Sequence, residues 1–428
     1  MKLYIETLGC AKNAIDSEVA AGILEAAGHT IIEDPRKADG IIVNTCGFIN
    51  DAKKESISRI FDMVEYKKKD GILIVSGCLS QRYSEELYKE MPEVDIFIGV
   101  NDYSHLPEIL RNHIAGKRER HHNTCESVFL ETGYRERMDP SYSATIKIAE
   151  GCDNLCAYCV IPLIRGSYRS RKMEDILKEA NELAASGCKE LIIIAQDVTA
   201  YGKDIYGELK LAALMKELCK VSGILWIRLM YCYEDRITDE LIQVMAEEDK
   251  VCNYIDIPIQ HVSDKILIAM NRRSTKASIL NTIARLRKAI PDIHIRTTLI
   301  TGFPGENKHD FEVLVDFIET EKLERLGVFT YSKEEGTPAA KMKNQVQEDT
   351  KKRREEIIME KQLKISLRSN EKKVGSILDV LVEGVEESGS YIGRSRYDAP
   401  EIDNSVIFTS SKKLKPGDIV EVKITDAF

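Results

Sequence analysis

The chain has 428 residues, of which 43% are hydrophobic and 31% are charged, and its formal net charge is −9. This length and composition suit a protein of about two or three domains with buried cores. The acidic charge argues against a broad nucleic-acid footprint and would suit a basic protein partner. The sequence shows neither a signal peptide nor an apolar run of membrane-spanning length, so we expect a cytoplasmic location without membrane contact. In that compartment the 11 cysteines are expected to be metal ligands or catalytic groups rather than disulfides.

The N-terminal third alternates short apolar strands with helices, which predicts a doubly wound parallel sheet over residues 1–116. Strands are expected at residues 3–8, 41–43, 72–75 and 94–98, and helices at residues 16–27, 52–68 and 84–91. Cys10, Cys46 and Cys78 each follow the carboxyl end of a strand, next to a glycine. Because such strand ends share one edge of the sheet, we expect the three thiols to lie together. They could be ordinary core cysteines, but their shared topological position favours an iron–sulfur site with one open iron.

Residues 117–137 lose this alternation and are rich in charge, so we predict a linker there. The stretch contains His121, His122 and Cys125, which together could suggest a metal site. Nothing nearby completes such a site, and we therefore interpret Cys125 as a bystander.

The most informative motif is the loop that contains Cys152, Cys156 and Cys159, three thiols within eight residues. A triplet at one fixed spacing arises by chance in roughly 1% of chains with this cysteine content. Three thiolates so close can hold one face of a cubic iron–sulfur cluster and leave the fourth iron free to coordinate a small molecule. The alternative is half of a structural zinc site, which would need a fourth Cys or His nearby. None follows in the next stretch of the chain.

Strands and longer helices alternate again over residues 138–368, which predicts a partial (βα)6 barrel. Strands are expected at residues 146–148, 191–195, 225–230, 254–257, 293–300 and 325–331, and helices at residues 172–185, 211–218, 276–288 and 310–321. The cysteine loop follows the first strand, at the mouth where barrel active sites form. Other polar or glycine residues follow later strands and suggest a rim for a small zwitterionic ligand, although each could be an ordinary loop residue. They are Gln196, Asp197, Gln260, His261, Gly302 and Gly305.

Residues 348–370 read as a charged connecting helix, and a β pattern follows from residue 374 onward. Strands expected at residues 376–385, 389–394, 405–409 and 418–423 predict a small antiparallel β-barrel over residues 371–428. That region holds 8 Lys and Arg against 11 Asp and Glu. Because an RNA-binding barrel is expected to be basic, this acidic barrel indicates a basic protein surface as its partner.

The CxxxCxxC loop resembles that of the radical S-adenosylmethionine (SAM) superfamily. The stretches TLGCAKN (residues 7–13), NTCGFI (44–49) and GCLSQRY (77–83) are similar to those of methylthiotransferases, and the terminal barrel resembles a TRAM domain. Within that family, YIDIPIQH (254–261), RTT (296–298) and YSKEEGT (331–337) resemble the branch that modifies a ribosomal protein rather than the tRNA branch. The resemblance covers nearly the whole chain.

This resemblance implies two 4Fe-4S clusters, a radical-generating one on Cys152, Cys156 and Cys159 and a sulfur-donating one on the three N-terminal cysteines. One SAM would yield a 5′-deoxyadenosyl radical that removes hydrogen from the β-carbon of an aspartate in ribosomal protein uS12, and a second SAM would supply the methyl group. Unactivated C–H bonds need such a radical, because protein side chains are too weak as bases. Tyr158 would pack on the adenine or serve in the core.

The resemblance also implies a low-potential electron donor of the flavodoxin or ferredoxin type, and a sulfur donor. Two other functions stay open from the residues alone. A tRNA adenosine C2 methylthiotransferase would share the clusters and the barrel. A non-catalytic metal-binding adaptor of the ribosome would use the same cysteines as zinc ligands or leave them idle.

Overall fold

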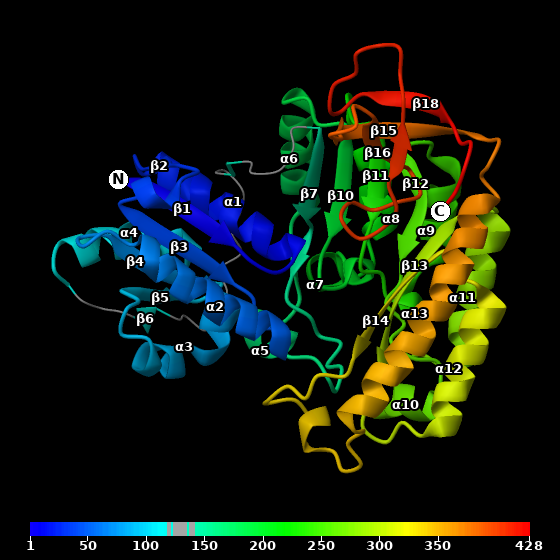
Figure 1. The fold of residues 1–428 in the computed structure, drawn as a ribbon, viewed down its shortest axis with the longest axis horizontal. Helices are drawn as coiled ribbons and strands as arrows, with labels where there is room; N and C mark the ends of the chain where they lie inside the picture. Colours follow the sequence, from blue (N-terminus) through cyan, green and yellow to red (C-terminus); the bar gives the residue numbers. More distant parts are fainter. Residues whose placement is uncertain (118–120, 123–134, 137–141) are drawn as a thin grey trace. The chain divides into compact units, whose positions relative to one another are not determined.

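The computed structural model describes residues 1–117, 121–122, 135–136 and 142–428 (Figure 1). The chain divides into two compact units. The first unit comprises Met1–Asp139, Ala149–Asp153 and Cys159–Asp175. The second unit comprises Pro140–Ile148, Asn154–Tyr158 and Ile176–Phe428. Most of the predicted linker, Cys125 included, lies outside the described residues.

In the described part of the first unit, six parallel strands form a sheet in the order β2-β1-β3-β4-β5-β6. Their bounds are β1 Lys2–Thr7, β2 Thr30–Ile31, β3 Gly40–Thr45, β4 Ile72–Gly77, β5 Ile96–Ile98 and β6 His121–His122. The helices are α1 Ala11–Ala26, α2 Asn50–Tyr66, α3 Cys78–Glu90, α4 Leu106–Ile114 and α5 Ile161–Arg165. The predicted doubly wound sheet is confirmed. Strand β6, which pairs with β5, lies inside the stretch predicted as a linker.

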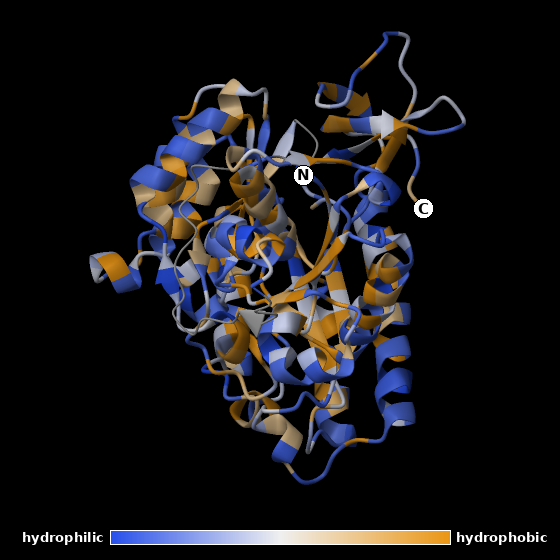
Figure 2. Cartoon of the chain, turned by 90° about the vertical axis from the view of Figure 1, so that its left-hand side faces the viewer, coloured by the Kyte–Doolittle hydropathy of each residue, from blue (hydrophilic) through white to orange (hydrophobic). Residues whose placement is uncertain are grey.

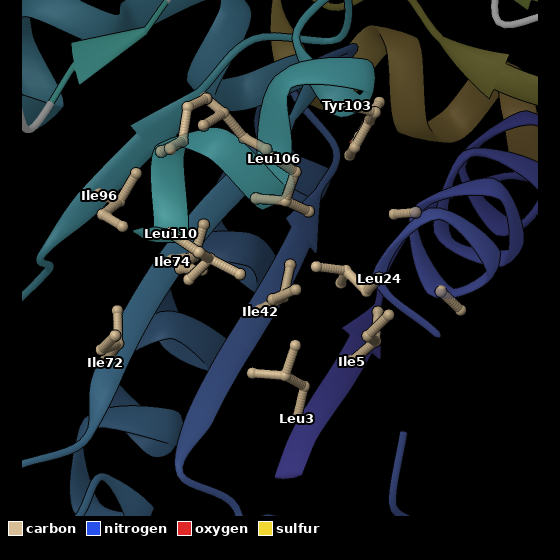
Figure 3. Packing of buried hydrophobic residues seen from close by; sticks show 14 residues of the cluster. Leu3, Ile5, Leu24, Ile42, Ile72, Ile74, Ile96, Tyr103, Leu106 and Leu110 are labelled. Atoms are coloured by element: carbon tan, nitrogen blue, oxygen red, sulfur yellow. The ribbon is translucent and has the colours of Figure 1, made fainter. Parts of the chain in front are cut away.

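Both faces of this sheet are covered, because alternate strand residues point to opposite sides. On one face, residues such as Ile42 and Ile74 pack against Leu24 of α1 and Leu106 of α4 (Figure 3). On the other face, Val43, Val75 and their neighbours pack against α2 and α3. The strands are therefore buried on both sides and are nearly continuously apolar, as the parallel arrangement requires.

The second unit contains six parallel strands whose order in the sheet follows their order in the chain. They are β7 Ser143–Lys147, β10 Glu190–Ile194, β11 Trp226–Leu229, β12 Val251–Asp256, β13 His294–Thr301 and β14 Arg325–Thr330. The helices that alternate with them along the chain are α6 Met173–Ala185, α8 Leu211–Cys219, α9 Asp239–Glu247, α11 Lys276–Ala289 and α12 Lys308–Glu321. Most residues of these strands are buried. Figure 2 shows hydrophilic and hydrophobic residues alternating along the helices of the chain. The expected partial (βα)6 barrel is confirmed.

Smaller elements complete the chain. Two short helices are α7 Lys203–Tyr206 and α10 Asp264–Ala269. The 3₁₀ turns are η1 Pro35–Lys37, η2 Tyr103–His105, η3 Val198–Ala200, η4 Glu234–Arg236 and η5 Ala339–Lys341. In the first unit, β8 Ala149–Glu150 pairs antiparallel with β9 Arg169–Ser170.

The connecting helix α13 Glu348–Glu371 leads into a curled antiparallel sheet of the order β17-β16-β15-β18, within the fully described stretch 142–428. Its strands are β15 Ile377–Val385, β16 Tyr391–Ser395, β17 Val406–Phe408 and β18 Ile419–Lys423. Val380, Val382 and Phe408 form its small apolar core. This sheet confirms the predicted terminal barrel.

Buried ion pairs join this terminal barrel to the amino ends of the central strands. Arg394 of β16 contacts Glu190, the first residue of β10, at 2.6 Å. Arg325, the first residue of β14, contacts Asp398 at 2.6 Å, and all four side chains are less than 5% exposed. The terminal barrel therefore covers the amino ends, and the carboxyl ends remain available for a catalytic site.

Across the residues that the structure describes, no helix combines the length and the apolar character needed to span a membrane.

Candidate active site

The carboxyl ends of β1, β3 and β4 bring the three N-terminal thiols together, as expected. Cys10 precedes α1, Cys46 directly follows β3, and Cys78 begins α3. Gly9 has a φ of +94°, and a Cβ there would lie 2.8 Å from Cys46 Cβ, so only glycine allows this loop to approach so closely. The pKa of Cys46 is raised to about 11, mainly by burial and to a smaller extent by the nearby Cys78 and Cys10.

Asparagines connect the loops that carry these thiols. Asn13, wholly buried in α1, donates from its side chain to the carbonyls of Leu8 and Thr45 at 2.9 and 3.0 Å. Asn44 donates in turn to the Asn13 carbonyl at 2.8 Å. Both asparagines lie in the motifs singled out above, where their role had no visible signal. They hold the first two thiol loops in one arrangement.

Arg165 lies beside these thiols, although no motif in the sequence pointed to it. It ends α5, is 3% exposed, and directs Nη2 at Cys78 Sγ (3.3 Å) and at Asn13 Oδ1 (2.8 Å). Its Nη1 donates to Asp16 at 2.6 Å and to Glu150 at 3.2 Å. Burial alone would lower the pKa of Arg165, but these carboxylates and Cys78 hold it well above its usual value. The one visible signal was an arginine that ends the apolar run after Cys159.

The ends of the second cysteine loop belong to the first unit. Cys152 donates its backbone N–H to the Gly166 carbonyl at 3.1 Å. Cys159 Sγ accepts the N–H of Ile161 at 3.4 Å. Amide donors aimed at sulfur are typical of cysteine ligands of iron–sulfur clusters, whose properties depend on such hydrogen bonds.

The middle of this loop belongs to the second unit. Its backbone is fixed by Ala157, which donates to the Met270 carbonyl and accepts from Ala339, both at 2.8 Å. Cys156 Sγ lies 2.8 Å from the hydroxyl of Tyr233. Burial raises the pKa of Tyr233 well above its usual range, so the phenol is neutral and can donate to a thiolate.

Tyr233 is itself held by a buried cation. The Arg272 guanidinium carbon lies 4.2 Å from the centre of the Tyr233 ring, and its Nη2 contacts Glu234 at 3.0 Å. The Arg272 and Glu234 side chains are each 1% exposed. No motif in the sequence pointed to these three residues: Tyr233 and Arg272 lie in loops, and Glu234 begins η4.

The predicted pocket residues fall into two groups. Tyr158 packs edge-on against Phe303, with ring centroids 6.5 Å apart, beside a buried apolar cluster. Gln260 has a φ of +69° and donates to the Pro258 carbonyl at 3.3 Å. Gly305 has a φ of +85° and open space where a Cβ would stand. These three residues, with Gln196, remain predicted contacts of a ligand.

The other three predicted residues act within the protein fold. Asp197 is wholly buried, accepts from Asn154 of the cysteine loop at 2.8 Å and pairs with Arg236. His261 has no exposed surface, and its Nδ1 accepts the N–H groups of Val262 and Ser263 at 2.9 Å. Gly302 has a φ of +72°, and Lys351 of α13 occupies the space that a Cβ would need.

None of the ten described cysteines forms a disulfide with another described cysteine. Among residues 1–117, 121–122, 135–136 and 142–428, no group of three His, Cys, Asp or Glu side chains is arranged to hold a single metal ion.

Family models match three parts of the chain. The model of the Radical SAM superfamily matches residues 146–318, and that of the TRAM domain matches residues 374–428. The model described as uncharacterized protein family UPF0004 matches residues 2–99, the region of the three N-terminal thiols.

Solved structures share the fold. The radical SAM methyltransferase TsrM from Kitasatospora setae superposes with a TM-score of 0.61 at 14% identity, over 91% of this chain and 84% of that one. The cobalamin-dependent SAM radical enzyme OxsB gives a TM-score of 0.57 at 13% identity, over 79% of this chain and 54% of that one.

Curated relatives are similar over the whole length. The protein named ribosomal protein uS12 methylthiotransferase RimO is 49% identical in Clostridioides difficile, over 100% of this chain and 97% of the relative. The protein of the same name from Acetivibrio thermocellus is 49% identical over 99% of this chain and 95% of the relative. The one from Clostridium kluyveri is 50% identical over 100% of this chain and 96% of the relative. The chain therefore belongs to the RimO family of radical SAM methylthiotransferases, enzymes that use 4Fe-4S clusters and SAM.

Proposed function

We propose that this methylthiotransferase acts on ribosomal protein uS12 and attaches a methylthio group to the β-carbon of an aspartate. The observation that carries the proposal is identity of 49% over the full chain with relatives named for that substrate. The acidic terminal barrel, with 8 Lys and Arg against 11 Asp and Glu, supports a basic protein partner over RNA.

We assign Cys152, Cys156 and Cys159 to the radical-generating cluster and Cys10, Cys46 and Cys78 to a second cluster. Each set offers three cysteine side chains outside any disulfide, which is the donor set for a 4Fe-4S cluster with one open iron. When bound there, the clusters and SAM supply one-electron cleavage of SAM to a 5′-deoxyadenosyl radical and transfer of methylated sulfur.

The chain's own residues orient this chemistry. Asp197 fixes Asn154 in the loop between the first two radical-site cysteines. Tyr233 offers its hydroxyl to Cys156 and shields that thiol from water. On the other set, Cys46 and Cys78 are buried and shielded from water, whereas Cys10 is exposed.

For SAM, we propose that Tyr158 flanks the adenine while Gln196, Gln260 and Gly305 line the pocket. Asp197, His261 and Gly302, which the sequence placed among the ligand contacts, would shape that pocket by positioning its loops. The aromatic cluster of Tyr158, Phe303 and Tyr331 supports this assignment, because an adenine ring packs well on such side chains.

The remaining assignments complete the proposal. We infer a domain division at residues 1–116, 138–368 and 371–428, with residues 117–137 as linker. A flavodoxin or ferredoxin type of electron donor and a separate sulfur donor would serve the reaction in the cytoplasm.

Reconstituted enzyme incubated anaerobically with purified uS12, or separately with tRNA, tests the substrate. We expect mass spectrometry to show one methylthio group replacing one hydrogen on an aspartate of uS12. A gain on tRNA adenosine alone would contradict the proposed substrate. Metal analysis tests the cofactors: two 4Fe-4S clusters predict about eight irons per chain. A colourless protein that contains zinc would instead support the non-catalytic adaptor.

A further inference from the structure

A hydrogen bond joins the cation of Arg165 to the sulfur of Cys78, one of the predicted cluster thiols. Its Nη2 lies 3.3 Å from Cys78 Sγ, and both residues belong to the first unit. Arg165 is 3% exposed and Cys78 6% exposed, so water hardly screens this contact. The arginine follows Cys159 by six positions along the chain, on the short helix α5.

The two carboxylates on the other side of Arg165 determine where its guanidinium points. Asp16 and Glu150 both take hydrogen bonds from Nη1, at 2.6 and 3.2 Å. Nη2 is left facing Asn13 Oδ1 and the Cys78 sulfur. A planar fork that bonds on two edges at once is specific to arginine, and a lysine ammonium cannot reproduce it.

We propose that Arg165 is a positioning residue of the second cluster, which orients Cys78 and raises the reduction potential of the cluster on Cys10, Cys46 and Cys78. Reduction adds negative charge to a cluster that thiolates already make negative. A buried cationic donor on a ligand sulfur stabilises the reduced state more than the oxidised state. Loss of Arg165 also removes a positive charge from beside Asp16 and Glu150, which shifts the potential in the same negative direction.

This inference rests on the assignment of Cys78 as a ligand, but not on the choice of uS12 as substrate. Its test therefore uses no substrate. Full-length protein with Cys152, Cys156 and Cys159 changed to Ala would carry the second cluster alone. In that background, Arg165→Met and Arg165→Lys are reconstituted, analysed for iron and sulfide, and titrated anaerobically while the cluster is followed by electron paramagnetic resonance.

We expect the midpoint potential of Arg165→Met to move to more negative values with four irons retained, and that of Arg165→Lys to move less far in the same direction. Arg59→Met is the matched control, because Arg59 lies in the same unit and its ion pairs are with Glu6 and Asp62 rather than with a thiol. Its potential should stay at the parental value. Unchanged potentials in both Arg165 variants would overturn the proposal.

Arg165→Met breaks the buried ion pair with Asp16 and could release the cluster for that reason alone. The double variant Arg165→Met/Asp16→Asn removes the cation together with one of the two buried carboxylate charges. The reduction potential of its cluster is the second measurement. This potential should also be more negative than the parental value. If Arg165→Lys lost its cluster while remaining folded by circular dichroism, Arg165 would have a purely structural role and the proposal would fail.

Discussion

The two cysteine sites present different partners to sulfur. At Cys78, the sulfur faces the charged guanidinium of Arg165, which two buried carboxylates hold in place. At Cys156, the sulfur faces the neutral hydroxyl of Tyr233. A cation, Arg272, is also present near Cys156, but it contacts the ring of Tyr233 rather than the sulfur.

This difference indicates how one chain can hold two similar clusters with unlike properties. Hydrogen bonds from a charged donor are roughly twice as strong as those from a neutral donor. The reduced state should therefore be stabilised more at the N-terminal site than at the radical site. A radical site must remain strongly reducing to cleave SAM, and a neutral donor suits that requirement.

The largest expected effect separates the two sites completely. Replacing Cys152, Cys156 and Cys159 by Ala should abolish formation of 5′-deoxyadenosine, because the radical cluster loses all its ligands. Replacing Cys10, Cys46 and Cys78 by Ala should leave 5′-deoxyadenosine formation intact and eliminate methylthio transfer. Chromatography of the nucleoside and mass spectrometry of the protein product measure the two activities. Equal loss of both in the N-terminal variant would contradict separate roles for the sites.

The placement of the thiols could be predicted because strand ends in parallel sheets have a simple topology. Apolar runs marked β3 and β4, and the cysteines followed directly. Helix α1 begins at Ala11, five residues earlier than predicted, because its first turns carry buried polar residues such as Asn13 and Asp16. These polar residues interrupt the apolar periodicity that would predict the start of the helix. Buried polar residues of this kind are typical of a functional site.

The partners of sulfur could not be predicted. Arg165 lies 87 residues from Cys78 in the sequence, and Tyr233 lies 77 residues from Cys156. Contacts at such separations leave no periodic signal in a single chain. His261 and Gly302 were visible as strand-end residues, but only the fold shows that one holds a turn and the other makes room for Lys351.

Removing the cation behind Tyr233 should lower the stability of the second unit strongly. Arg272→Met leaves Glu234 buried and unpaired, which costs about 3–5 kcal/mol. The double variant Arg272→Met/Glu234→Gln should recover much of that loss. Urea unfolding of cluster-free protein, followed by fluorescence of Trp226, measures it, because the chain's single tryptophan lies in β11 of the second unit. A loss below about 1 kcal/mol would show that this cation, unlike Arg165, carries little of the local charge balance.

Mild acid should lower the free energy of unfolding of the second unit through protonation of His261. Arg165 in the first unit does not change its charge in that pH range. Burial lowers the pKa of His261 to about 3, from 6.5 in the unfolded chain. The unfolded chain therefore binds the proton first, and stability present above pH 6.5 is lost as the pH falls toward 3. Between pH 7 and pH 5 this histidine accounts for about 2 kcal/mol.

His261→Asn is the matched variant for that measurement, since an amide oxygen can accept the same N–H groups of Val262 and Ser263 without titrating. The unfolding free energy from Trp226 fluorescence should depend less steeply on pH in this variant. His294, whose pKa burial lowers to about 2, retains its own contribution. Identical pH profiles for the two proteins would show that His261 does not titrate as its burial predicts.

The smallest effect is expected from removing the Tyr233 hydroxyl that contacts Cys156. Tyr233→Phe keeps the ring under Arg272 and removes one neutral hydrogen bond, worth about 1 kcal/mol. The rate of 5′-deoxyadenosine formation should fall less than about tenfold. The potential of the radical cluster, read in protein whose Cys10, Cys46 and Cys78 are Ala, should move in the negative direction by less than Arg165→Met moves the second cluster. A larger shift at the tyrosine than at the arginine would reverse the ranking of charged over neutral donors, and with it the explanation for how the two sites differ.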